Sequence, residues 1–316
     1  MSNNEMNEED YLKRHLQDLE DGQRKSEPTL NSDIPFNVSA SISENTKISD
    51  LQFFNFDIRE LPCGEFYPQG SMFMIRPAQV REIQAYSMVD DNNFYDIVEK
   101  MNDILQSCVR VKYPDGKVGS YIEVKDQDRL FLVFLIRELT FQQGNSLTVN
   151  SKCSCGQDVQ MELKRDHFSF HEIDEKLERY FSASTRTYHF STINGREFEL
   201  TPPNIGLQKS FTDYILKESN EKRTPNLSFL KIIPFMLAGR TSITYEGIKA
   251  KLKEFEEIDD ISFQFLNAAV GKMTFGIKEL KKKCSCGEEV HTDMQFPNGA
   301  SGIFVIHDAF EAYIKE

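Results

Sequence analysis

The sequence predicts an α+β fold made of two related halves, each built of helices and β-hairpins, behind an acidic N-terminal tail. The pentapeptide Lys-Cys-Ser-Cys-Gly occurs twice, at residues 152–156 and 283–287. Around both copies the patterns of a strand, helices and a cysteine-bearing hairpin follow one another in the same order. We therefore divide the 316-residue chain into a tail (1–50), a first half (51–180) and a second half (181–316).

The tail differs from the rest of the chain in composition. Residues 1–50 hold eleven acidic and five basic side chains, and after Gly22 they are rich in Ser, Asn and Thr. Such a segment buries too little apolar surface to fold alone, so we expect it to be disordered or partly helical. Apolar side chains at helical spacing in residues 8–20 predict the short helix. The alternative is that the tail becomes ordered on a partner.

The first half is predicted to begin with a strand and two helices. Met72–Ile75 reads as a strand, and Pro77 marks the start of a helix over 78–89. Asp and Asn residues in 89–93 are expected to cap a second helix. Six apolar side chains of that helix share one face and are expected in the core: Phe94, Ile97, Val98, Met101, Ile104 and Leu105.

A turn, a buried helix and the first cysteine hairpin complete this half. Pro114 and Gly116 predict a turn, because Pro presets φ and Gly supplies an unusual backbone angle. Residues 128–139 are apolar almost all round, which is typical of a buried helix. Strands are expected over 146–152 and 158–163, with Cys-Ser-Cys-Gly between them.

The second half repeats this order. Corresponding positions in the two halves lie 125 to 134 residues apart. The shortest offset is from Pro77 to Pro202, and the longest is from Phe141 to Phe275. Unequal but similar offsets indicate a duplication with loop insertions. The expected elements are a strand and a helix over 197–211, a helix over 226–239 that closes on Gly239, a buried helix over 259–275, and strands over 276–283 and 289–296.

The four paired cysteines are Cys153, Cys155, Cys284 and Cys286. A Cys-x-Cys-Gly turn points two sulfurs toward one centre, and two such turns supply the four thiolates of a closed, tetrahedral Zn²⁺ site. The sequence therefore predicts one structural zinc ion per chain in a zinc-ribbon-like site that joins the halves. Lysines directly before each pair would lessen its negative charge.

Three other interpretations stay open, because the spacing is one residue shorter than the usual C-x-x-C motif. The pairs could be redox-active, although redox motifs normally open a helix. They could be reduced cysteines without a metal. They could also hold a catalytic zinc with three protein ligands and water, although no His or Glu pair has suitable spacing. His291, five residues after Cys286, is the one spare ligand we consider.

The remaining candidate groups are expected to have structural rather than functional roles. Cys63 and Cys108 are expected to be buried, and His167 and His171 to have no functional role. Acidic pairs are expected to cap helices or lie on the surface: Asp90–Asp91, Glu256–Glu257 and Asp259–Asp260. The sequence shows no convergent set of titratable groups, nucleophile elbow or phosphate loop, so no catalytic residues are predicted and the chain is not expected to be an enzyme.

Composition limits the classes of partner. The net charge of −13 and the isoelectric point near 5.1 argue against nucleic acid and acidic membrane surfaces. The longest apolar run, Leu130–Ile136, is too short to span a bilayer, and no signal peptide is visible. We expect a soluble intracellular protein with reduced thiols and enough apolar residues, 39% of the chain, for a substantial core.

One longer pattern carries a family resemblance. It runs from "LPCGEFYPQGSMFMIRPAQVREI" through "ILQSCVRV" and "DRLFLVFLIRELTF" to "CSCG" and a strand. This order resembles the baseplate hub family of contractile-tailed, T-even-type bacteriophages. The resemblance covers roughly residues 59–165 and reaches the second half only through the internal repeat.

The resemblance implies a late, non-enzymatic structural or assembly protein of the tail, either a hub component or a hub assembly factor. Its partners would be other tail and baseplate proteins, in the virion baseplate or in the host cytoplasm during assembly. The alternatives are an intracellular zinc-ribbon adaptor and a thiol- or zinc-dependent enzyme.

Overall fold

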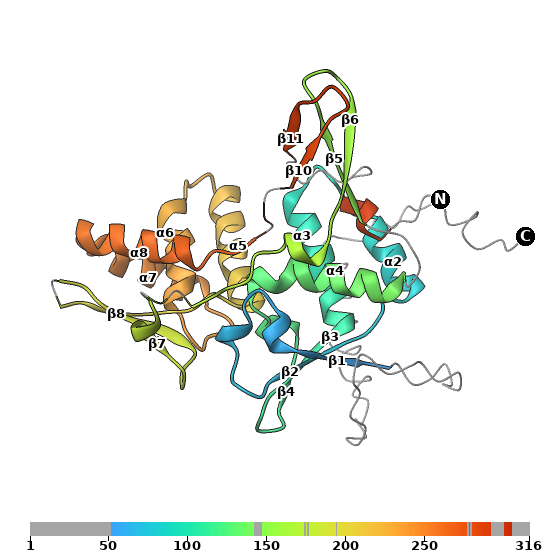
Figure 1. Cartoon of the computed structure of the whole chain (residues 1–316). Coiled ribbons are helices and arrows are strands. Elements are labelled where there is room, and N and C mark those ends of the chain that lie inside the picture. The colour runs from blue at the N-terminus through green and yellow to red at the C-terminus, as the bar shows by residue number, and fades with distance from the viewer. Residues whose placement is uncertain are drawn as a thin grey trace, which may run out of the picture. The chain divides into compact units, whose positions relative to one another are not determined.

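Helices and antiparallel strands combine in an α+β fold, as the sequence predicts (Figure 1). The computed structural model describes residues 52–141, 147–173, 175, 177–193, 195–276, 278, 280–291 and 300–304. The acidic tail and its predicted helix at 8–20 lie outside these residues. Within the described ranges, no helix is both long enough and apolar enough to cross a bilayer.

The first sheet has four antiparallel strands in chain order: β1 (Phe54–Asp57), β2 (Met72–Ile75), β3 (Val109–Lys112) and β4 (Val118–Gly119). Alternate side chains of β2 and β3 are buried, which is the pattern of a sheet with one face on the core. The turn between β3 and β4 is the predicted one. Gly116 has a φ of +85°, a conformation that side chains other than glycine rarely adopt.

Three helices follow in this part of the chain: α2 (Val80–Ser87), α3 (Phe94–Cys108) and α4 (Arg129–Thr140). Asn93 caps α3 by accepting the backbone N–H of Tyr95, so the cap expected within 89–93 is confirmed. Met101 and Ile104 are buried as predicted. The assignment of Phe94 to the core is wrong, because this first residue of α3 lies beyond the core and is 71% exposed.

The second part contains a three-stranded antiparallel sheet of β7 (Phe181–Ser182), β8 (Thr187–Ser191) and β9 (Glu197–Leu200). Only β9 was predicted. The β7–β8 hairpin was missed because polar residues outnumber apolar ones in it. Tyr188 and Phe190 do alternate with polar side chains in β8, and both are buried.

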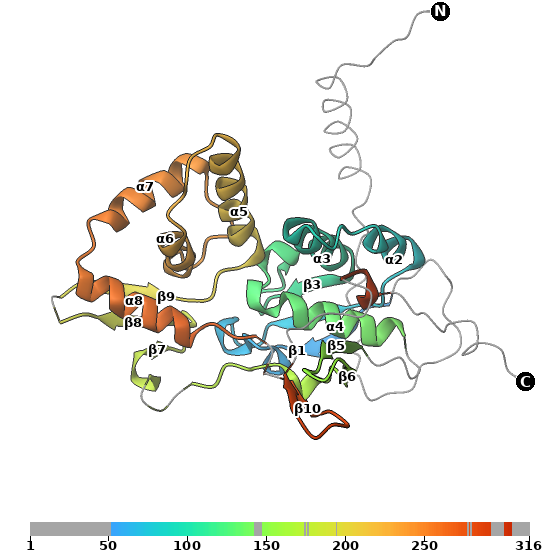
Figure 2. The same ribbon diagram turned by 90° about the horizontal axis from the view of Figure 1, so that it is seen from above.

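Four helices complete this part: α5 (Ile205–Asn220), α6 (Leu227–Ile232), α7 (Tyr245–Glu256) and α8 (Asp260–Lys272). The ring of Phe265 in α8 lies 5.1 Å from that of Phe190 in β8, and Figure 2 shows α8 next to this sheet. The helix predicted over 226–239 is shorter than expected. A 3₁₀ turn replaces it after Ile232, because Pro234 lacks the N–H that an α-helix needs. Gly239, with a φ of +73°, follows this turn.

Helices α7 and α8 differ from the prediction in separate ways. α7 was not predicted at all, since its many charged residues leave only Ile248 and Phe255 buried. α8 was expected to be buried all round, but it packs one face only. Leu266 and Val270 are buried, whereas Ile261 is 55% exposed.

One continuous hydrophobic core runs through both parts. The ring of Phe66, a residue between β1 and β2, stacks on that of Phe275 with centroids 6.4 Å apart. The backbone N–H of Asp126 donates to Pro203 O at 2.9 Å, which ties the start of α4 to the start of α5. Short 3₁₀ helices lie between the main elements: Ile58–Glu60, Gly64–Phe66, Tyr121–Glu123, Asp126–Asp128, Arg165–His167, Glu178–Tyr180, Ile233–Met236 and Ala300–Ile303.

Candidate metal centre

Two short hairpins carry the four paired cysteines. They are formed by β5 (Thr148–Lys152) with β6 (Asp158–Glu162) and by β10 (Lys281–Lys283) with β11 (Glu289–His291). Both turns are built alike. The N–H of Cys153 donates to Gln157 O at 2.9 Å, and the N–H of Cys284 donates to Glu288 O at 2.8 Å. The glycine after each second cysteine has a φ of +86° or +94°, so glycine is required there.

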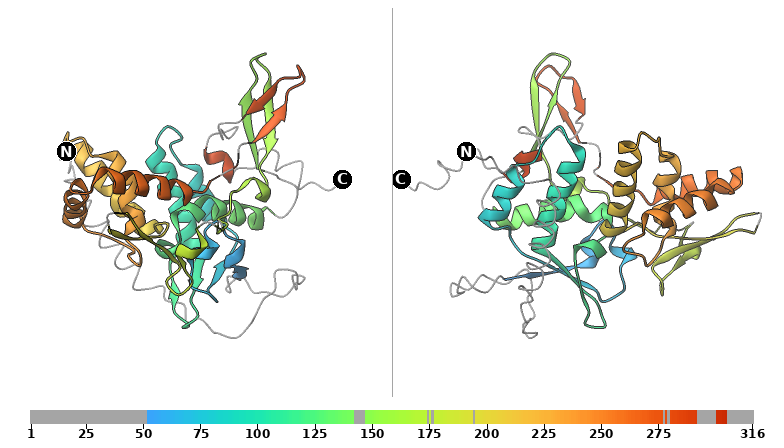
Figure 3. Two further views of the ribbon diagram at one scale, coloured as in Figure 1. Left: turned by 60° about the vertical axis from the view of Figure 1, so that its left-hand side comes forward. Right: turned by 180° about the vertical axis from the view of Figure 1, so that it is seen from behind.

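The hairpins lie side by side, with β5 next to β11 and β6 next to β10 (Figure 3). Polar contacts join them along their length. Ser151 Oγ donates to His291 O at 2.7 Å, and Lys282 Nζ donates to the backbone oxygen of Gln160 at 2.8 Å. The two cysteine turns therefore meet at the same end of the paired hairpins.

The four sulfurs form one cluster. The Sγ atoms of Cys153, Cys155, Cys284 and Cys286 all lie within 4.8 Å of one another. Two pairs reach from one hairpin to the other: Cys153 to Cys286 at 3.5 Å and Cys155 to Cys284 at 3.7 Å. In a tetrahedral zinc site with bonds of about 2.3 Å, the sulfurs lie roughly 3.8 Å apart. The cluster thus could hold a metal ion, and its two cross-hairpin separations are close to this value.

Around the sulfurs, each hairpin supplies one side chain that accepts hydrogen bonds from the cysteine turn of the other hairpin. Gln157 of the first hairpin accepts hydrogen bonds from the Cys284 thiol, at 3.3 Å, and from Ser285 Oγ. Glu288 of the second hairpin accepts from the Cys153 thiol, at 3.4 Å, and from Ser154 Oγ. Each residue follows the first cysteine of its own hairpin by four positions. Neither residue was predicted from the sequence, although this shared position is a signal that could have identified them.

The crowded thiols have unequal pKa values. The N–H of Cys286 and the neighbouring thiols donate to the sulfur of Cys284 and lower its pKa to about 6. The pKa of Cys153 rises to about 12, because burial and the other three sulfurs outweigh the N–H of Cys155. Without a cation, one thiol of the cluster therefore ionises readily, and its negative charge opposes ionisation of a second thiol. A bound dication would offset this repulsion and favour four thiolates.

The other residues considered as ligands or as charge partners lie elsewhere. His291 is not part of the sulfur cluster, and its Nε2 lies 3.8 Å from Glu289 Oε1. Lys281 faces the same carboxylate at 3.9 Å. His167 Nδ1 accepts the backbone N–H of Lys164. These contacts are local to the strands and turns that carry them.

His171 is packed in the core rather than at the metal centre. Its Nε2 is hydrogen-bonded to Tyr188 Oη at 3.0 Å, and its ring lies 4.6 Å from that of Phe66. Burial lowers the pKa of His171 to about 4, so the ring is neutral near pH 7.

A convergent set of titratable groups exists at the start of α4, contrary to the sequence analysis. Asp128, which is fully buried, accepts the N–H of Cys63 at 2.8 Å and the O–H of Tyr67 at 2.6 Å. Tyr67 Oη in turn accepts the N–H of Lys125 at 2.7 Å. Burial raises the pKa of Asp128 to about 7 and lowers that of Lys125 to about 8. The set joins the segment that holds Cys63 and Tyr67 to the segment that holds Lys125 and Asp128, so we assign it to holding the fold.

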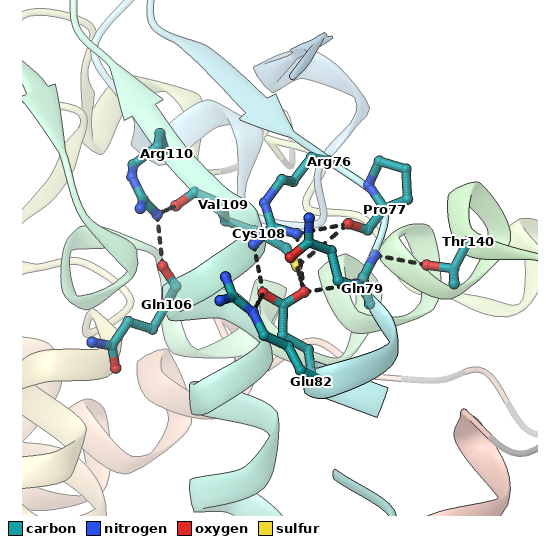
Figure 4. Close-up of polar contacts among 11 residues, drawn as sticks. Arg76, Pro77, Gln79, Glu82, Gln106, Cys108, Val109, Arg110 and Thr140 are labelled. Atoms are coloured by element: carbon teal, nitrogen blue, oxygen red, sulfur yellow. Dashed lines mark hydrogen bonds and ion pairs between the residues drawn. The ribbon is translucent and has the colours of Figure 1, made fainter. Parts of the chain in front are cut away.

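A buried ion pair fixes the start of α2 (Figure 4). Arg76 donates to both carboxylate oxygens of Glu82, at 3.0 and 2.6 Å, and both side chains are buried. The thiol of Cys108 faces the same carboxylate at 3.7 Å. Cys63 and Cys108 are both fully buried, as predicted. Burial opposes ionisation of Glu82, but the hydrogen bonds from Arg76 and Gln79 lower its pKa overall.

Comparisons with protein-family models, with curated proteins and with solved structures gave no match to this chain.

Proposed function

We propose that this chain is a non-enzymatic structural or assembly protein of a phage tail baseplate, stabilised by one structural Zn²⁺. Its role would be that of a hub component or a hub assembly factor, exerted through contacts with other tail proteins. The observation that carries the metal part is the four-sulfur cluster contributed by two hairpins. The ordered sequence pattern over residues 59–165 supports the phage part.

A structural rather than catalytic ion agrees with the ligand set. Four thiolates fill all positions of a tetrahedral zinc ion, which leaves none for water or substrate. Ser285 donates to Gln157 and Ser154 donates to Glu288 without using a thiol proton. These two hydrogen bonds would therefore remain with four thiolates and would hold the two turns around the ion. In this arrangement the ion joins β5–β6 to β10–β11 and performs no chemistry.

We further propose that the chain consists of two related halves that share this ion. The two hairpins repeat the pentapeptide, the turn hydrogen bonds and the reciprocal outer contacts. Each half would supply two ligands of a zinc-ribbon-like site. Neither hairpin could then bind the ion tightly alone, so the metal would connect residues 131 positions apart, from Cys153 to Cys284.

The metal part can be tested on the purified full-length chain. We expect one zinc per chain by elemental analysis, and a cobalt-substituted form with the spectrum of tetrahedral four-thiolate coordination. A folded, metal-free protein with four reactive thiols in the two hairpins would refute structural zinc. A cobalt spectrum that shows a water ligand would favour a zinc-dependent enzyme instead.

The assembly part requires the phage that encodes the chain. Deleting the coding sequence should leave infected cells with heads but without assembled tails, and expression of the wild-type chain in trans should restore tails. Electron microscopy of the lysates measures both outcomes. Normal tails in the deletion would refute a role in baseplate assembly. Mass spectrometry of purified wild-type particles then separates a retained component from a transient factor.

A further inference from the structure

The four sulfurs are also arranged as two matched pairs. Cys286 and Cys155 are exposed, whereas Cys153 and Cys284 are buried. The exposed Cys286 lies 3.5 Å from the buried Cys153, and the exposed Cys155 lies 3.7 Å from the buried Cys284. Each pair thus combines an accessible thiol with a nearby thiol in the other hairpin.

We propose that these pairs are sites of oxidation, and that peroxide converts them into two disulfides between the hairpins, Cys153–Cys286 and Cys155–Cys284. The oxidised form would keep the hairpins joined after the metal has left. This inference rests on the four-cysteine centre of the proposed function, and it assigns that centre a second, covalent state.

The chemistry balances with hydrogen peroxide as the oxidant. An exposed thiol first gives its proton to water. The resulting thiolate attacks one peroxide oxygen, the O–O bond breaks, and a sulfenic acid and hydroxide form. The buried partner sulfur then attacks the sulfenic sulfur, the S–O bond breaks, and a second hydroxide leaves as the S–S bond forms. Each disulfide consumes one peroxide and releases two electrons from sulfur. Four thiolates and two peroxides thus give two disulfides and four hydroxides, and a bound dication is released unchanged.

The surroundings favour pairing across the hairpins. A disulfide requires the sulfurs to approach to about 2.05 Å, and both cross-hairpin pairs already lie in contact. The reciprocal contacts of Gln157 and Glu288 hold the two turns against each other during this approach. Both hairpins keep their own hydrogen bonds, because the new bonds join turns that already touch. Oxidation therefore changes the bond that holds the hairpins, not their arrangement.

The chain contains its own control for specificity. The remaining two of its six cysteines, Cys63 and Cys108, are fully buried in the part of the chain that holds β2 and α3. Burial shields both thiols from peroxide and raises the pKa of Cys108 to about 12, so both should stay reduced. Selective loss of four thiols out of six is the expected signature.

Trypsin can distinguish pairing between hairpins from pairing within them. Cleavage after Lys152 and Lys164 releases Cys153 and Cys155 in one peptide, and cleavage after Lys283 releases Cys284 and Cys286 in another. After mild peroxide treatment of the full-length chain and blocking of free thiols, we expect the two peptides joined by two disulfides. Separate peptides that each contain an internal disulfide, cysteines carried to sulfinic acid, or equal oxidation of Cys63 would overturn the proposal.

The pairing itself is tested with two double variants. C155S/C284S retains Cys153 and Cys286, which lie in contact, whereas the matched control C155S/C286S retains Cys153 and Cys284, the two buried thiols. We expect the first to form its disulfide several-fold faster, and equal rates would contradict the assigned pairs. Should either variant fail to fold, fragmentation of the linked wild-type peptides between their cysteines identifies the pairs directly.

Zinc measured in the same sample before oxidation keeps the two proposals apart. Linked peptides from a chain without zinc would refute the structural metal but support the disulfides. A zinc-loaded chain that yields only internal disulfides would support the metal and refute the disulfides. Release of zinc together with formation of linked peptides would support both.

Discussion

The paired cysteine hairpins and the region around α4 are stabilised by different means. The hairpin strands are three to five residues long, and all three side chains of β10 are exposed. Four apolar residues of these strands are buried: Val149, Val159, Met161 and Val290. By contrast, six residues of α4 are buried, and Asp128 and the Arg76–Glu82 pair fix the segments beside it. We therefore expect the first region to depend on a link between sulfurs, whereas burial and hydrogen bonds hold the second.

From this difference we predict that loss of the metal does not unfold the whole chain. A two-stranded hairpin is marginal in water without further contacts, so the hairpins should open when the sulfurs are no longer joined. The α4 region contributes many of the buried side chains of the common core and should persist. Four substitutions test this division, in order of decreasing effect.

The largest effect is expected for Cys153→Ser, which removes one of the four sulfurs proposed to bind the metal. Structural zinc binding is worth on the order of 10 kcal/mol, and much of this is lost with a ligand. We expect hydrogen exchange to accelerate over 148–162 and 281–291 while α4 stays protected. Cys63→Ser, which leaves the cluster intact, is the control. Equal loss of protection in α4 would contradict two separately stabilised regions.

Glu82→Ala should destabilise the other region. It leaves the guanidinium of Arg76 buried without its carboxylate partner, which typically costs about 3–5 kcal/mol. Denaturant unfolding measures the loss, and zinc content should not change. Arg81→Ala is the matched control, because Arg81 is exposed and lies 3.8 Å from the same carboxylate. A loss of zinc in Glu82→Ala would show that the regions are coupled.

Asp128→Asn should change how stability depends on pH. The folded pKa of Asp128, about 7, lies above its ordinary value of 3.8. Its contribution is therefore fully present below about pH 4 and is lost as pH rises through 7, by at most about 4 kcal/mol. His171 acts oppositely, because its lowered pKa gives stability that is lost as pH falls from 6.5 toward 4.

The difference between wild type and Asp128→Asn isolates the aspartate from the histidine. We expect the variant to lose less stability than the wild type between pH 5 and pH 8, as measured by urea unfolding at several pH values. Parallel curves for the two proteins would refute the raised pKa. The zinc content at each pH indicates whether the hairpins respond as well.

The smallest effect is expected for Gln157→Ala. Loss of a residue that orients metal ligands typically costs 10- to 100-fold in metal affinity, which is about 1–3 kcal/mol. Competition with a chelator measures the affinity, and Glu288→Ala should behave similarly because its contacts are reciprocal. Gln160→Ala, on the same hairpin but bonded through its backbone oxygen, is the control. An unchanged metal affinity in Gln157→Ala would refute the proposed orienting role of this residue.

Elements with strong local patterns were predictable. The apolar spacing and Asn cap of α3, the apolar run of α4 and the Pro–Gly turn before β4 each leave a periodic or stereochemical signal. The β7–β8 hairpin and α7 were missed because polar or charged residues dominate them. The end of α6 was misplaced because Pro234 outweighs the apolar run around it.

The sequence alone determined the ligand types of the candidate site and the glycines that its turns require, since both are properties of single residues and short spacings. Tertiary structure decided which sulfurs meet, with Cys153 facing Cys286 and Cys155 facing Cys284. It also placed Asp128 against Cys63, which is 65 residues away. Such contacts depend on how distant segments pack together, and packing is governed by the whole core rather than by any local pattern.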